Sequence, residues 1–64
     1  MTRIRRGGYI FMTWKGDHPP RHVHVYNDDE LVLKWNLEEN CVLRGDAPRA
    51  LRDLIAQLQK EGAL

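Results

Sequence analysis

Residues 22–36 read HVHVYNDDELVLKWN, and the fold of the chain follows from this stretch. Its first half alternates: His22, His24 and Tyr26 would lie on one face of a β-strand, and the valines between them on the other. The asparagine and two aspartates at 27–29 favour a tight turn, because their side chains hydrogen-bond to the nearby backbone. The stretch therefore begins with a half-buried strand that ends in a turn.

Strand-like patterns continue on both sides of that turn. Leu31, Leu33 and Trp35 recur at every second position, which predicts a second strand and closes an antiparallel hairpin. Upstream, residues 9–14 (YIFMTW) are rich in strand-forming side chains and precede a loop that contains two prolines. Downstream, residues 41–44 (CVLR) predict a brief last strand. We therefore expect a sheet of three to four antiparallel strands.

The C-terminal part predicts one amphipathic helix over residues 46–61. Asp46 is placed to cap its first turn, and Gly62 lies where a helix stop belongs. Four apolar residues have the i, i+3, i+4, i+7 spacing that gathers them on one side of a helix: Leu51, Leu54, Ile55 and Leu58. The predicted fold class is α+β, a small sheet packed by one C-terminal helix.

The predicted organisation is a single domain over residues 1–64, with a flexible basic N-terminus at 1–7, the sheet at 8–45 and the helix at 46–61. The sheet face beneath the helix is expected to hold Val23, Val25, Leu31, Leu33, Trp35 and Leu43. The opposite face would carry His22, His24, Tyr26, Lys34 and Arg44. An exposed face of that composition is a candidate surface for binding or dimerisation.

Composition limits the cellular compartment and the functional classes that we expect for this protein. Ten basic and nine acidic residues give a net charge of +1, without the basic excess of a dedicated nucleic-acid binder. Cys41 is the only cysteine, so we expect a small buried thiol and a reducing compartment. The first residues show no apolar run, which predicts a cytoplasmic protein without membrane association. So small a core favours added stability from a protein partner or a homodimer.

Two segments carry a family resemblance. Residues 17–25 read DHPPRHVHV, and residues 42–48 read VLRGDAP and lead into the helix. Together they resemble a small bacterial family, the domain of unknown function 4160, with two departures: Arg21 replaces a usual third proline and Val23 a usual aromatic residue. The resemblance implies a protein that is often encoded beside a small partner and belongs to toxin–antitoxin-like pairs.

The same segment offers candidate metal ligands. His22 and His24 would project from one strand face, and Asp17 and His18 could approach from the preceding loop, which supplies nitrogen and oxygen ligands for a metal ion. The alternative is that the histidines hydrogen-bond to loop carbonyls and order the turn at 19–20. Because a His-x-His pair alone is a weak pattern, we favour the structural role and expect no cofactor.

Three classes of function remain open. The favoured one is a non-enzymatic module that binds a protein partner, as half of a regulatory or toxin–antitoxin-like pair or as a small inhibitor. The alternatives are a metal-dependent hydrolase or nuclease and a nucleic-acid-binding module. No serine and no glycine-rich phosphate loop is present, so no catalytic residue is assigned. The candidate binding residues are His22, His24, Tyr26, Trp14, Arg21 and Arg44.

Overall fold

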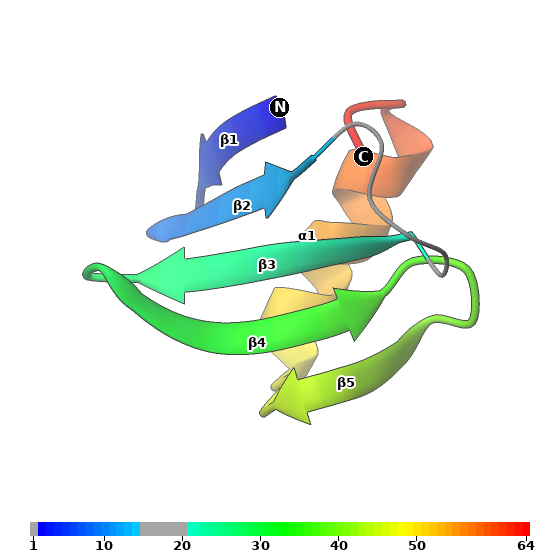
Figure 1. Ribbon diagram of the computed structural model, residues 1–64. Coiled ribbons are helices and arrows are strands. Elements are labelled where there is room, and N and C mark those ends of the chain that lie inside the picture. Colours follow the sequence, from blue (N-terminus) through cyan, green and yellow to red (C-terminus); the bar gives the residue numbers. More distant parts are fainter. Residues whose placement is uncertain (1, 15–20) are drawn as a thin grey trace.

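The computed structural model describes residues 2–14 and 21–64 and shows an antiparallel sheet with one helix behind it (Figure 1). The predicted α+β class is confirmed, but the sheet has five strands rather than three to four. They lie side by side in chain order. The elements are β1 (Thr2–Arg6), β2 (Tyr9–Thr13), β3 (His22–Asn27), β4 (Glu30–Asn36), β5 (Cys41–Gly45) and α1 (Arg49–Lys60).

The additional strand is β1, in the segment that was expected to be a flexible basic end. It pairs with β2 through a two-residue turn made of Gly7 and Gly8, both with positive φ. Such hairpin turns favour glycine, because both central residues take the left-handed conformation. Ile4 faces Phe11 across the pair and packs against the core, which gives the strand an apolar anchor.

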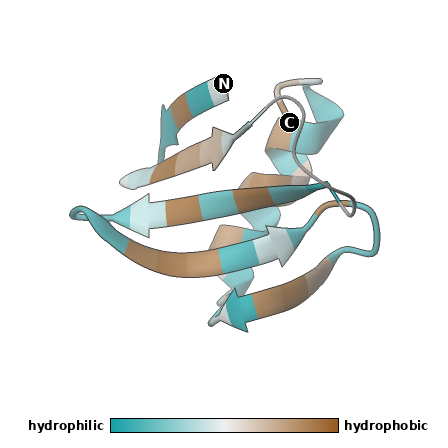
Figure 2. Ribbon diagram, viewed as in Figure 1, coloured by the Kyte–Doolittle hydropathy of each residue, from teal (hydrophilic) through white to brown (hydrophobic). Residues whose placement is uncertain are grey.

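The core lies between α1 and the sheet face that it covers. Phe11, Val23, Val25 and Leu33 are fully buried on that face. From the helix they are met by Leu51, Ile55 and Leu58, while Leu54 is partly buried, so the predicted apolar stripe is confirmed. The alternation of brown and teal along β3 in Figure 2 is the period-two pattern that separates the two faces.

Two β-bulges correct the predicted inner face. In β4, Leu33 pairs with Val25, but the next pair joins Leu31 to Tyr26, so Val32 is an extra residue without a partner in β3. Leu31 therefore lies with Tyr26 on the sheet face opposite α1 instead of on the inner face. Leu31 is consequently 42% exposed instead of buried. A second bulge makes Leu43 an extra residue between β4 and β5, and Leu43 is 44% exposed.

β5 is an edge strand without a buried residue, and this overturns a second expectation. Cys41 was predicted to be a small buried thiol, but it is exposed. The physical reason is its position at the end of the sheet, beyond the strands whose residues form the core. Local apolarity at residues 41–43 therefore reflects strand propensity rather than burial.

The helix ends as expected but begins differently. Its N-cap is Pro48, which makes no side-chain hydrogen bond. The prediction that Asp46 caps the helix is therefore wrong. At the other end Gly62 has a φ of +79°. The N–H of Ala63 donates to the carbonyl of Leu58 over 2.9 Å, and that of Gly62 donates to Gln59 over 3.1 Å. This pair of bonds is the Schellman motif that a glycine stop permits. In the described ranges, no helix has the length and apolarity needed to cross a membrane.

Candidate binding face

The sheet face opposite α1 is not covered by any element of the described chain, and we call it the outer face (Figure 1). Strand register assigns its members, because residues that pair across neighbouring strands point to the same side. One row runs across all five strands: Arg3, Met12, His24, Lys34 and Arg44. A second row contains Arg5, Ile10, Tyr26 and Leu31. The outer face thus combines cations with aromatic and aliphatic side chains.

The histidines form the centre of the outer face. The ring centroids of His22 and His24 lie 5.0 Å apart with an interplanar angle of 73°. The indole of Trp14 meets His24 edge-on, with centroids 4.8 Å apart. All three side chains are half-buried. The prediction of adjacent, partly exposed histidines above buried valines is confirmed, and the alternation of β3 is its local cause.

In the part of the chain that the structure describes, no ion pair neutralises the positive charge of the outer face. Lys34 and Arg44 face each other across β4 and β5, although like charges directly opposite each other destabilise a sheet. In residues 2–14 and 21–64 the one ion pair joins Arg6 to Glu61 instead. Among the described acidic residues, two lie in the β3–β4 turn at 28–29, and two lie in the β4–β5 turn at 38–39. Lys34 and Arg44 therefore present positive charge, while Asp29 lies at one corner of the outer face.

The Arg6–Glu61 contact belongs to the other side of the molecule. The guanidinium donates to the carboxylate over 2.6 Å and ties the end of β1 to the C-cap of α1. This hydrogen bond lowers the pKa of Glu61 and raises the pKa of Arg6, with the charge attraction between them acting in the same directions. Both groups are exposed to solvent, so the contact orders β1 without burying charge.

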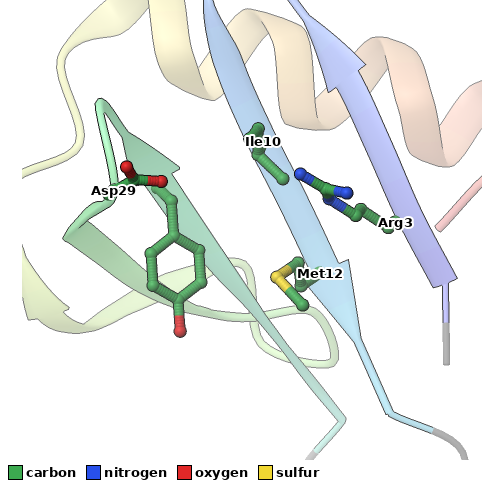
Figure 3. Close-up of a pocket in the computed structure, with 5 residues that line it drawn as sticks. Arg3, Ile10, Met12 and Asp29 are labelled. Atoms are coloured by element: carbon green, nitrogen blue, oxygen red, sulfur yellow. The ribbon is translucent and has the colours of Figure 1, made fainter.

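A pocket of about 330 Å³ lies at one corner of the outer face (Figure 3). Its lining residues are Arg3, Ile10, Met12, Tyr26 and Asp29. Of these, only Tyr26 was among the candidate binding residues. Arg3 could have been found from the sequence, because a Gly-Gly turn at 7–8 predicts a hairpin that places Arg3 on the face of the histidines. No local pattern places Asp29 in the pocket.

The remaining candidate residues differ in position. Arg44 joins the outer face, whereas Arg21 lies just before β3, where its backbone is bound to the β4–β5 turn. The N–H of Arg21 donates to the Glu38 carboxylate over 3.2 Å, and its carbonyl accepts the N–H of Leu37 over 2.8 Å. Trp35, expected in the core, is 6% exposed and lies there.

The metal-ligand set is tested only in part. Asp17 and His18 lie outside the described residues. Among the residues that are described, no group of three or more histidine, cysteine, aspartate or glutamate side chains is placed to hold a metal ion. His22 and His24 remain the one adjacent pair from the predicted set, so a metal site stays a prediction.

One comparison with known proteins identifies a family for this chain. The family model described as Domain of unknown function (DUF4160) matches residues 7–62. The chain belongs to this family. The DUF4160 match begins at the first hairpin turn, so β1 and its Arg3 precede the matched range. No curated protein and no solved structure matches the chain. For this DUF4160 member, the association with toxin–antitoxin pairs stays a prediction.

Proposed function

We propose that this protein is a non-enzymatic interaction module that binds an acidic protein partner through its outer face. It would act as one half of a regulatory or toxin–antitoxin-like pair. The observation that carries the proposal is the pairing of Lys34 with Arg44, extended by Arg3 and Arg5 across the same face. Like charges that face each other across two strands cost a free protein stability, and an acidic partner surface would relieve that cost.

The side-chain types on the outer face support a protein partner. Arginine, methionine and aromatic residues are enriched in protein interfaces, and tryptophan, tyrosine and arginine contribute most of the binding energy. Here Trp14, Tyr26 and Met12 lie among the cations. A partner would bury these rings, while its carboxylates would meet Lys34 and Arg44 at the centre and edge of the sheet.

The ring geometry favours protein over single-stranded nucleic acid. Stacking of bases requires open ring faces. Trp14 and His24 pack edge to face at 83°, and His22 and His24 at 73°, so part of the ring surface in this cluster is already in contact with a neighbouring ring. The nucleic-acid alternative therefore becomes an outcome of the test rather than a second proposal. The metal-dependent hydrolase or nuclease alternative would use Asp17, His18, His22 and His24 as metal ligands. It stays a prediction, because Asp17 and His18 lie outside the described residues.

The test uses the product of a neighbouring gene with an acidic surface as the ligand in titration calorimetry. Lys34→Glu with Arg44→Glu should weaken binding by about tenfold or more, because both cations would lie within the interface. The control is Arg49→Glu with Lys60→Glu, which makes the same charge change on exposed positions of α1. It should change affinity by less than about twofold, since rim and remote charges act weakly.

Two results would contradict the proposal. Equal losses in the outer-face and helix variants would mean that only net charge matters. Binding of a single-stranded oligonucleotide that depends on Lys34 and Arg44, without binding of the protein ligand, would assign the outer face to nucleic acid.

A further inference from the structure

The corner pocket of the outer face has a distinct charge at each end. Arg3 enters it from β1, and Asp29 enters it from the β3–β4 turn. Figure 3 shows the guanidinium of Arg3 and the carboxylate of Asp29 on different sides of Ile10, with Met12 below them, and Tyr26 also lines the pocket. Within the described part of the chain, the one ion pair is Arg6–Glu61, so neither charged end of the pocket is neutralised by the other.

The spacing of these charges limits the ligand. β1 and β3 are separated by β2, and two strand spacings amount to about 10 Å. A ligand that contacts both Arg3 and Asp29 must therefore reach across β2. The volume of about 330 Å³ is near the lower limit for small-molecule sites. The pocket therefore fits a small ligand with an anion at one end, hydrogen-bond donors at the other and a flat apolar part between.

Asp29 determines which donors fit. An ionised carboxylate only accepts hydrogen bonds, and its two oxygens can accept two parallel donors. Among the four RNA bases, guanine alone presents two adjacent N–H donors, N1–H and N2–H, on its Watson–Crick edge. Adenine, cytosine and uracil each place an acceptor beside the donor, which would face a carboxylate oxygen. The acidic end of the pocket therefore selects guanine.

The other lining residues complete a nucleotide site. A base is flat and stacks on aromatic rings, which Tyr26 supplies, and the polarisable thioether of Met12 packs favourably against aromatic systems. The planar fork of Arg3 matches a phosphate through two parallel N–H bonds. The order of the lining residues, from acid through aromatic to arginine, follows the order of chemical groups along a nucleotide.

We infer that this pocket binds a guanine nucleotide, with the base edge on Asp29, the base plane against Tyr26 and Met12, and the phosphate on Arg3. The inference goes beyond the proposed function and does not rest on it, although Arg3, Met12 and Tyr26 belong to both surfaces. The shared ligand chemistry is a guanosine phosphate, free in solution or at the 5′ end of an RNA.

The test is an NMR titration of the full chain with guanosine monophosphate, following the backbone amides of Ile10, Met12 and Tyr26. Adenosine, cytidine and uridine monophosphates, guanosine and inorganic phosphate are titrated in parallel. The guanine nucleotide should bind at least about tenfold tighter than the other three, because even one lost hydrogen bond to a charged group implies about a tenfold loss. Guanosine should bind more weakly than its phosphate. A short RNA with a 5′-phosphorylated guanosine identifies the source: tighter binding assigns RNA, equal binding the free nucleotide, and either supports the site.

Matched variants locate the interaction. Asp29→Asn should abolish the preference for guanine, whereas Asp28→Asn should leave it unchanged, because Asp28 does not line the pocket. Both positions have positive φ, at 66° and 52°, and asparagine tolerates this conformation as well as aspartate. Arg3→Gln should weaken binding of the monophosphate but not of guanosine.

Three results would overturn the inference. The first is equal affinity for the guanine and adenine nucleotides. The second is inorganic phosphate binding as tightly as the nucleotide, which would mean that Arg3 binds an anion only. The third is Asp29→Asn, with an unchanged melting temperature, keeping the preference for guanine. Partner binding by the Lys34 and Arg44 variants is measured separately, so either proposal can fail alone.

Discussion

Gly45→Ala tests whether β5 approaches β4 as closely as the structure places it. Gly45 ends β5 with a φ of +88°. A Cβ built there would overlap with the carbonyl oxygen of Val32 and lie 3.0 Å from its carbonyl carbon and 3.2 Å from the Cα of Leu33. These atoms belong to the backbone of β4, so no side-chain rotation could relieve the contact. The end of β5 would have to move away from the sheet.

Two costs add in this variant. The left-handed conformation costs an alanine about 1 kcal/mol relative to glycine. Steric overlap that forces a backbone shift adds about 1–3 kcal/mol, which gives a total of about 2–4 kcal/mol. A domain of 64 residues has a free energy of unfolding of about 3–10 kcal/mol. We therefore expect a large loss, visible as a fall in melting temperature of roughly 4–8 °C per kcal/mol.

Gly62→Ala provides the matched control. Gly62 has a similar φ of +79°, but a Cβ there would meet nothing within 4 Å, so only the conformational cost of about 1 kcal/mol applies. Urea unfolding followed by tryptophan fluorescence gives both free energies, and their difference isolates the steric contribution. If Gly45→Ala cost no more than Gly62→Ala, the close approach of β5 to Val32 would be refuted.

The other predictions concern the bulge and the surface ion pair. Leu33→Ala should lower the free energy of unfolding by about 2–5 kcal/mol, and Leu31→Ala by less than about 0.5 kcal/mol, because the bulge exposes Leu31; equal losses in urea unfolding would contradict the register. Because the pKa of Glu61 is lowered in the folded state, its contribution is present above the unfolded carboxyl pKa and is lost as pH falls through the folded value. The melting temperature should fall slightly as pH is lowered through this range, and Arg6→Gln should remove this fall. The same pH profile in Arg6→Gln as in the unchanged protein would be evidence against the ion pair.

Local patterns were sufficient for much of the fold. The alternation of residues 22–26 correctly placed Val23 and Val25 in the core and the histidines on the opposite face. The helix stripe and the Gly62 stop were also predicted, because helix periodicity and capping depend on residues only a few positions apart. These features follow from backbone geometry, which repeats regardless of what the segment packs against.

Local patterns failed where a strand met its neighbour. Leu31 continues a regular apolar alternation, yet a bulge exposed it, since a bulge is set by the pairing of two strands rather than by one. Leu43 is exposed with the rest of the edge strand β5. The prediction of a buried Cys41 failed because only the order of strands makes β5 an edge. The segment at 1–7 was judged by its charge, although its glycine turn is typical of a hairpin.

The sequence by itself therefore determined the α+β class, the hairpin of β3 and β4, the helix and the family. It also determined five outer-face residues: His22, His24, Tyr26, Lys34 and Arg44. Only the tertiary structure brought Arg3 and Asp29, which are 26 positions apart, to the ends of one pocket and set Lys34 opposite Arg44. The physical reason is that a side chain's face is fixed by local backbone period, whereas its neighbours are fixed by strand order, register and bulges, which depend on the packing of the whole sheet against its helix.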